Sequence, residues 1–414
     1  MYRQCVIALL GAAALLCFGT GAGTALAGPI RSVGAMTFVD ANTLVVADWR
    51  AGELQALHLA PAPPGTGQAF NLRNISTPIA EKLQVRPEDL RFEDLAFRPE
   101  SELAYISLSV IQGSGMPRPA LVAVDAGGRI SVVDLAVPHE SAALKSEPAA
   151  DKFLWRDVPE ATLTVTDLVY HAGKLYVAGL SNASFASTLR VYAYPFTGSP
   201  TMASIEMYHP VHNEFETRAP IRAMAIVDLD GEPNLVAAYT CTPLVTIPLK
   251  ELKDGAHVKG KTIAELGWGS APVDMVTFDT KQGEMVLLTN THKSADLMPV
   301  TRIAAAAKQP GLTTPIKWPD APLLGLKATY LPMAGIAQLG SQNGEFFGAL
   351  RRDEESGAMQ LVSIRKGAFL RLSDFVNEYD FADFHYQPGD VFRGLHQVLR
   401  TDEGYPDLAK RAAP

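Results

Sequence analysis

Cysteine is scarce in this chain, and most of it lies near the start. Of the three cysteines in 414 residues, Cys5 and Cys17 fall in the first apolar stretch, and Cys241 is the only other one. A single thiol cannot form an internal disulfide, so the folded part must be held together by its core. The chain also has no Cys-x-x-Cys-His run, which excludes covalently attached haem within it. We interpret Cys241 as a small buried hydrophobic residue.

Positive charge and long apolar segments are also in short supply. Lysine and arginine number 36 against 44 acidic residues, which gives a formal net charge of −8. A nucleic-acid-binding protein needs a basic face, so this balance argues against that class. Beyond the first residues, no segment approaches the roughly 20 apolar residues that a membrane span requires. We therefore expect no nucleic-acid partner and no membrane span.

Familiar catalytic signatures are missing as well. The sequence has no glycine-rich phosphate loop, no Gly-x-Ser-x-Gly elbow and no His-Glu-x-x-His motif. These absences exclude the common nucleotide-binding, serine hydrolase and zinc protease motifs. Whether the chain is an enzyme stays open at this level.

The first residues predict export. Arg3 precedes an apolar stretch from Cys5 to Phe18, and small residues then lead to Ala25-Leu26-Ala27. A basic start, a moderate apolar core and small residues before the cut are typical of a secretory signal peptide. We predict a signal peptide over 1–27, a mature chain that begins at Gly28, and a periplasmic or secreted location.

Six short apolar runs, rich in β-forming residues, recur along the rest of the chain. They are Leu44–Ala47, Ala104–Ser107, Leu175–Ala178, Leu235–Ala238, Met285–Leu288 and Phe346–Ala349. Each follows a shorter apolar run, and turn formers such as Asn343-Gly344 lie between the two. Short strands joined by such turns are hairpins. Third strands follow in most units, and fourth strands are plausible in several.

Repeated units of four antiparallel strands predict an all-β fold, a β-propeller with six four-stranded blades. A seventh blade within Val137–Glu160 is the alternative. We place the propeller over 28–376 and an aromatic, acidic tail over 377–414, which either closes the ring as a strap or docks a partner. The pattern of a turn followed by Leu-Tyr-Val-Ala resembles the six-bladed lactonase-like and NHL-like propellers. That resemblance implies a fold and leaves the function open.

Aligning the innermost strands predicts one ring of residues around the central channel. Its occupants are Ala35, Asp94, Asp167, Ala223, Asp274 and Gly335. Three converging carboxylates repel each other unless a cation lies between them, and hard oxygen ligands suit calcium. The other interpretation is that each aspartate bonds local backbone N–H groups. Arg222 precedes a blade without an aspartate, where it could neutralise the carboxylates or hold an anionic ligand.

Loops that follow the second strands should open beside the mouth of the channel. They carry Asn182, Asn290 and His292, which we predict to bind ligand together with the three aspartates and Arg222. A separate segment, 209–216, is the densest cluster of potential metal ligands. If it is extended, His212, Glu214 and Glu216 share one side, and such a set suits zinc or iron. A solvated connection between blades is the other interpretation of that segment.

Three functions follow from these patterns. The first is a scaffold that binds a small molecule or a partner protein at the channel face. The second is a metal-dependent hydrolase or lyase, in which calcium held by Asp94, Asp167 and Asp274 polarises a carbonyl or activates water. The third is a propeller subunit of a periplasmic redox enzyme whose cofactor lies on another chain. The complete fold without a complete catalytic motif favours the scaffold.

Overall fold

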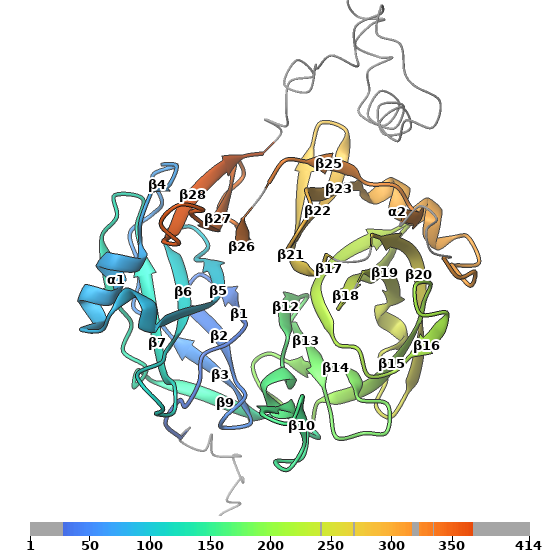
Figure 1. Ribbon diagram of the computed structural model, residues 1–414, viewed down its shortest axis with the longest axis horizontal. Coiled ribbons are helices and arrows are strands. Elements are labelled where there is room, and N and C mark those ends of the chain that lie inside the picture. Colours follow the sequence, from blue (N-terminus) through green and yellow to red (C-terminus); the bar gives the residue numbers. More distant parts are fainter. Residues whose placement is uncertain (1–27, 241, 268–269, 317–322, 334, 367–414) are drawn as a thin grey trace, which may run out of the picture.

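The computed structural model describes residues 28–240, 242–267, 270–316, 323–333 and 335–366. The predicted signal peptide over 1–27, Cys241 and the predicted tail over 377–414 lie outside the described residues. Within them the fold is all-β with few helices, and its sheets stand around a common centre as a β-propeller (Figure 1).

Four of the sheets have four antiparallel strands each, and we name each sheet after its innermost strand. The β1 sheet contains β1 (Met36–Asp40), β2 (Thr43–Asp48), β3 (Glu53–His58) and β9 (His139–Ala143). The β5 sheet contains β5 (Leu90–Phe97), β6 (Ala104–Val110), β7 (Arg118–Val124) and β8 (Ile130–Val132). The β21 sheet contains β21 (Pro272–Thr280), β22 (Gly283–Asn290), β23 (Ala295–Pro299) and β25 (Thr329–Leu331). The β26 sheet contains β26 (Ile336–Ser341), β27 (Phe346–Arg352), β28 (Met359–Arg365) and β4 (Asn71–Leu72).

The remaining large sheet has ten strands. One half is β12 (Asp167–His171), β13 (Lys174–Leu180), β14 (Ser187–Ala193) and β15 (Thr201–His209). The other half is β17 (Ile221–Leu229), β18 (Glu232–Tyr239), β19 (Pro243–Pro248) and β20 (His257–Leu266). The outer strands β15 and β20 pair in parallel and join the halves, while β16 (Glu214–Glu216) pairs with β15 and β24 (Leu323–Gly325) with β20.

The prediction of six separate blades is therefore wrong in this respect. Four sheets stand alone, and the two units expected between them are merged. The physical reason is the length of the outer strands, because β15 and β20 have 9 and 10 residues and extend far enough to pair over Ser204–Met207 and His257–Gly260. The alternative of a seventh blade in Val137–Glu160 is also wrong. That segment supplies β9 and a small hairpin of β10 (Phe153–Leu154) and β11 (Val158–Pro159).

The six expected apolar runs do form second strands, in β2, β6, β13, β18, β22 and β27. Strand β2 is buried along its whole length, and Leu44, Val45 and Val46 have no solvent exposure. A continuous apolar run in a strand means that both faces are covered. Each second strand thus lies between two neighbouring sheets, which explains why the core is distributed between the sheets.

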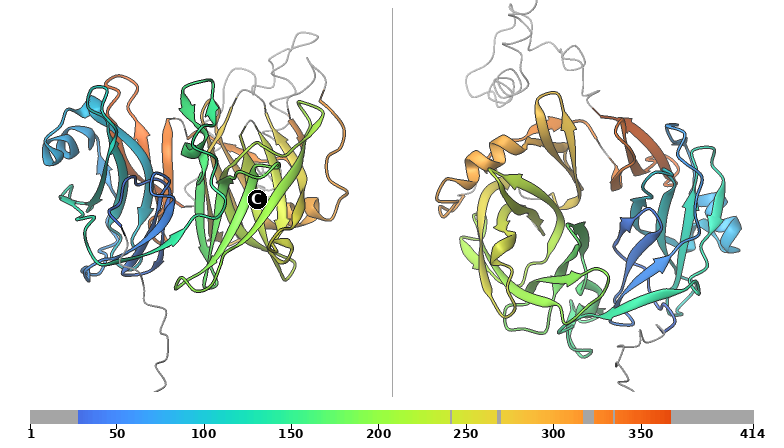
Figure 2. Two further views of the ribbon diagram at one scale, coloured as in Figure 1. Left: turned by 90° about the horizontal axis from the view of Figure 1, so that it is seen from below. Right: turned by 180° about the vertical axis from the view of Figure 1, so that it is seen from behind.

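The chain does not visit the sheets in the order in which they surround the centre. Contacts between innermost strands give the order β1, β12, β17, β21, β26, β5 and back to β1 (Figures 1 and 2). After the β1 sheet the chain therefore turns to one side to build the β5 sheet. It returns along the outer edge of the β1 sheet as β9 before it reaches β12 on the other side. The linker between β3 and β5 supplies β4, the outer strand of the last sheet.

In the described residues the helices are short, and the two α-helices lie on the outer side of the ring (Figure 1). They are α1 (Ser76–Leu83) and α2 (Val300–Ala307), and three 3-10 turns lie at Pro87–Asp89, Glu160–Leu163 and Leu249–Glu251. Among the residues that the structure describes, neither α-helix has the length and apolarity needed to cross a bilayer.

Glycine allows one close approach that closes the ring. Phe97 at the end of β5 packs on Gly340 and Gly348 of the β26 sheet, and a Cβ on Gly348 would lie 1.9 Å from Phe97 Cζ. This contact joins the sheet built last to a sheet built early.

We predict that Gly348→Ala lowers the free energy of unfolding by about 1–3 kcal/mol, because the added methyl group overpacks the contact with Phe97. Urea unfolding of the mature chain measures this change. The matched control is Gly344→Ala in the turn of the same hairpin, where a Cβ meets nothing within 4 Å. Adding Phe97→Leu should recover part of the loss in Gly348→Ala. Equal unfolding curves for the wild type and Gly348→Ala would contradict the described packing.

Candidate functional site

Three aspartates lie at equivalent positions of their innermost strands: Asp94 in β5, Asp167 in β12 and Asp274 in β21. In each, Oδ1 accepts a hydrogen bond from the next backbone N–H of its own strand, at 2.7–2.8 Å. In each, Oδ2 accepts from a backbone N–H of the neighbouring innermost strand. These donors are Met36 at 2.6 Å for Asp94, Met224 at 2.7 Å for Asp167 and Leu339 at 2.8 Å for Asp274.

The cross-strand bonds occur at alternate interfaces of the ring. They join β5 to β1, β12 to β17 and β21 to β26. The innermost strands are therefore fastened in three pairs, each with one aspartate and one backbone donor. A carboxylate that accepts two backbone N–H groups satisfies donors that the sheet edges would otherwise leave open at the centre.

In each pair, one strand carries the aspartate and the other, the donor strand, supplies the backbone N–H. The sequence predicted a small residue in the donor strand at the position equivalent to the aspartate. Ala35 and Ala223 occupy this position, but the third position belongs to Gln338 and not to Gly335. Gly335 precedes β26, and the prediction took Ile336 as the residue that follows the ring position. The backbone donor to Asp274 is instead Leu339, three residues later in the same strand. Gln338 Nε2 donates to the Glu93 carbonyl oxygen at 2.8 Å, which links β26 to β5.

Burial shifts the acidity of the three aspartates. It raises the pKa of Asp94 to about 7 and that of Asp167 to about 6, and it places the pKa of Asp274 well above its usual value. The backbone N–H bonds lower these values only in part, and Arg222 lowers the pKa of Asp167. Charge repulsion from Asp94 and Asp167 raises the pKa of Asp274 further. The three carboxyls thus form one electrostatic group near the ring centre.

The same geometry bears on the expected calcium site. Both oxygens of each aspartate already accept backbone N–H groups. The three are also not among the described residues whose candidate ligand atoms all lie within 4.8 Å of one another. Calcium binding by Asp94, Asp167 and Asp274 stays a prediction, and it would require these oxygens to share their N–H donors with the ion.

The remaining predicted residues lie at the end of the ring where the innermost strands begin, which we call the start face. Second strands run antiparallel to the first and end on this face. Asn290 ends β22 there and is buried, and its Nδ2 donates to Ser294 O at 3.1 Å and to Asp296 Oδ2 at 3.0 Å. The Asn290 side chain therefore fixes the loop after β22.

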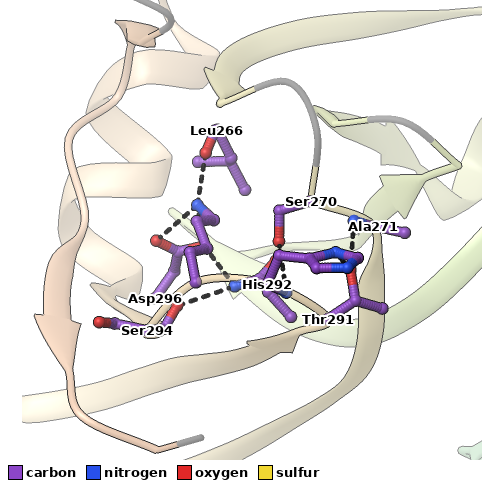
Figure 3. A network of polar contacts seen from close by, with 9 residues as sticks. Leu266, Ser270, Ala271, Thr291, His292, Ser294 and Asp296 are labelled. Atoms are coloured by element: carbon purple, nitrogen blue, oxygen red, sulfur yellow. Dashed lines mark hydrogen bonds and ion pairs between the residues drawn. The ribbon is translucent and has the colours of Figure 1, made fainter.

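Two residues that sequence reasoning missed, Lys293 and Asp296, also hold the loop after β22 in place; Asp296 is labelled in Figure 3. Asp296 is fully buried, and its carboxylate forms an ion pair with Lys293 at 2.8 Å. Lys293 Nζ also donates to the carbonyl oxygen of Leu266 in β20. Burial raises the pKa of Asp296, which Lys293 and Asn290 oppose. The available signal was a lysine and an aspartate three residues apart, where the loop after β22 enters β23.

Open side chains on the start face come from His292 and Asn182, which are both exposed. The His292 N–H donates to Ser270 Oγ at 3.2 Å, and its ring Nδ1 lies 2.7 Å from Thr291 Oγ1 (Figure 3). The Asn182 N–H donates to the Ser146 carbonyl oxygen at 2.9 Å. Arg222 is half-buried at a register shift at the start of β17, beside Asp167. These contacts anchor the backbone and leave the His292 and Asn182 side chains facing solvent.

One surface cavity lies elsewhere. It measures about 320 Å³ and is lined by α2 and by the turn between β17 and β18, with Asp228, Thr301 and Lys308 among its residues. That turn lies at the end of the strands opposite the start face. None of the predicted site residues lines it.

No protein-family model matches the chain, and no curated protein sequence matches it significantly. Solved structures that resemble it include the β-propeller domain of Myceliophteria thermophila Cps50 (Swd1), at 11% identity, with 82% of this chain and 99% of that chain covered and a TM-score of 0.33. The periplasmic gluconolactonase PpgL of Pseudomonas aeruginosa is 13% identical, with 83% and 89% covered and a TM-score of 0.32. Hydrazine synthase of Kuenenia stuttgartiensis is 12% identical, with 85% and 99% covered and a TM-score of 0.34. The propeller architecture of this chain rests on its own sheet arrangement.

The raised pKa values predict a pH dependence of stability. A carboxyl whose folded-state pKa exceeds its unfolded value contributes stability at acid pH, and this is lost as the pH rises through the folded pKa. In Asp94→Asn the amide replaces one acceptor with a donor, so the variant should be less stable at about pH 5. The difference in unfolding free energy between the wild type and Asp94→Asn should become smaller by about pH 8, because Asp94 of the wild type then carries a buried charge.

Urea unfolding at several pH values measures this difference. Asp279→Asn is the control for the same chemical change, because Asp279 lies exposed on the innermost strand β21. If the difference in unfolding free energy between the wild type and Asp94→Asn grows as the pH rises, the raised pKa of Asp94 is contradicted.

Proposed function

We propose that this protein is an exported β-propeller that binds a small molecule or a partner protein at the start face and performs no chemistry on it. The observation that carries the proposal is the use of Asp94, Asp167 and Asp274. All three accept backbone N–H bonds from the neighbouring innermost strand, so these acids hold the scaffold together. The signal-peptide pattern over 1–27 supports export to the periplasm or beyond.

The start face offers groups suited to recognition. His292 and Asn182 present exposed polar side chains on rigid strand ends, and Arg222 adds a guanidinium beside the ring centre. Loops held on a rigid scaffold are where binding residues usually lie. A planar guanidinium favours an anionic or carboxylate-bearing ligand. The ion pair between the half-buried Lys293 and the buried Asp296 keeps the loop that carries His292 in place.

One experiment tests this assignment. The protein, purified under native conditions from the exported fraction of its own host, is examined by native mass spectrometry. We expect a bound molecule or protein that is lost in His292→Ala and in Arg222→Ala. The matched controls are His171→Ala, at the exposed end of β12, and Lys281→Ala, in an exposed hairpin turn. Both lie at the opposite end of the ring, and both variants should keep the bound species.

Two outcomes contradict the proposal. The wild type from the exported fraction carries nothing, or all four variants keep the bound species equally. Circular dichroism of each variant establishes that the fold is retained.

A calcium-dependent hydrolase is the second candidate, and one observation favours it. The three aspartates keep partial exposure and repel one another, which is a situation that a cation relieves. The scaffold proposal expects the melting temperature of the wild type to be the same with millimolar calcium, magnesium or chelator. If the protein is a calcium-dependent hydrolase, calcium should raise the melting temperature of the wild type by mass action, and Asp274→Asn should abolish that rise.

A further inference from the structure

A hairpin on the outer rim of the ten-stranded sheet brings together three side chains that sequence spacing had grouped differently. His209 ends β15, Glu216 ends β16, and His212 lies in the turn between them (Figure 1). The register pairs His209 with Glu214 and Met207 with Glu216. Glu216 is therefore the diagonal neighbour of His209 on one face of the hairpin, and diagonal neighbours are within reach of long side chains.

The turn that places His212 is fixed by its own contacts. Asn213 has a left-handed φ of 55°, and its Oδ1 accepts a hydrogen bond from the Tyr208 hydroxyl at 2.8 Å. The Pro210 carbonyl oxygen accepts the Ile316 N–H at 3.0 Å. These bonds turn the His212 ring back toward the hairpin, where its centroid lies 4.1 Å from that of His209.

Both imidazoles meet one carboxylate oxygen. Glu216 Oε1 lies 2.7 Å from His209 Nδ1 and 2.5 Å from His212 Nδ1. Within the described part of the chain, this is the one group of three or more His, Cys, Asp or Glu residues whose ligand atoms all lie within 4.8 Å of one another. Two imidazole nitrogens and a carboxylate oxygen form the donor set of His₂Glu zinc sites.

A second carboxylate lies on the far side of His209. Glu265 of β20 places Oε2 3.7 Å from His209 Nε2, and its side chain has no solvent exposure. Neither oxygen has a hydrogen-bond partner of ordinary geometry among the described residues, although the Thr242 hydroxyl and the Gly267 N–H lie close enough to oppose the rise in the Glu265 pKa that burial causes. Burying a carboxylate whose hydrogen bonds are so poorly formed is costly and calls for an explanation. A carboxylate behind a ligating histidine fixes the tautomer that directs the other ring nitrogen to the metal.

We propose that His209, His212 and Glu216 bind a divalent transition-metal ion of the zinc type, and that Glu265 orients His209 for this role. The ion takes the place of the hydrogen bonds between the two Nδ1 atoms and Glu216 Oε1. His209 is buried, Glu216 is 19% exposed and His212 is 52% exposed, so the site is open to solvent on the His212 side. Water from that side completes a tetrahedral shell around the three protein ligands.

The site has a structural position of its own. Its ligands come from the hairpin on β15, and its orienting residue comes from β20, the partner of β15 in the parallel pairing that merges the two halves of the sheet. A bound ion would connect these halves near their ends on the start face. None of its ligands is among His292, Asn182 and Arg222, so this proposal does not depend on the ligand binding proposed for the start face.

Isothermal titration of the chelator-treated mature chain with zinc chloride tests the proposal. We expect one equivalent to bind with a micromolar or tighter dissociation constant and to raise the melting temperature. His212→Ala, an exposed change that should leave the fold intact, and Glu216→Gln should abolish this binding. Glu265→Gln should weaken it by about 10–100-fold, the usual cost of losing an orienting carboxylate. With cobalt(II) as the probe, the wild type should show the visible absorption of a tetrahedral ion, and His212→Ala should not.

The matched control is His257→Ala. His257 also contacts a carboxylate, Glu206 at 3.0 Å, on strands β20 and β15, but it belongs to no group of three ligands in the described residues. This variant should bind zinc as the wild type does. The proposal is overturned if the wild type binds no zinc, if His212→Ala binds it as tightly, or if His257→Ala loses it to the same extent. In those cases the cluster is a histidine–glutamate hydrogen-bond network without a metal.

Discussion

The hydrogen bond from one innermost strand to the carboxylate of the next is the constraint on which the ring depends. The innermost strands of a propeller do not pair with each other, so their backbone N–H groups at the centre need another acceptor. Asp94, Asp167 and Asp274 provide it across three of the six interfaces. Their raised pKa values show that burial disfavours the charged carboxylates. The hydrogen bonds that each carboxylate accepts from two neighbouring strands offset this energy and fix the strands relative to each other.

The sequence predicted the local units well, since local patterns determine them. Each second strand is a short apolar run between turn formers, and Leu175–Ala178 falls in β13 as expected. Alignment of those runs also found the three aspartates at equivalent positions. The partner of each Oδ2 could not be predicted, because the N–H of Met36 lies 58 residues from Asp94 along the chain. Gln338 was missed because β26 begins with the apolar residue Ile336, and apolar spacing alone could not show that Leu339 is the donor to Asp274.

Contacts between distant segments account for the other differences. The parallel pairing of β15 with β20 joins the outer edges of two units, and no residue in either strand indicates that neighbour. The same holds for the histidine cluster. In an extended strand, His209 and Glu216 would lie on opposite sides, and only the hairpin register places them together. Glu265 then approaches from a strand almost fifty residues further along.

The weaving of the early chain through the ring has a consequence for how the molecule is assembled. Strand β4 leaves the ribosome and crosses any membrane long before β28, yet it has no partner until β28 arrives. During that interval it is an unpaired edge, and its two-residue length with Asn71 at its start limits the surface that another chain could join. Strand β9 similarly completes the β1 sheet only after the β5 sheet has been made. Neither the β1 sheet nor the β26 sheet can therefore form from one continuous segment of the chain. The ring is interlocked, so its folding is expected to be cooperative across the whole propeller and not sheet by sheet.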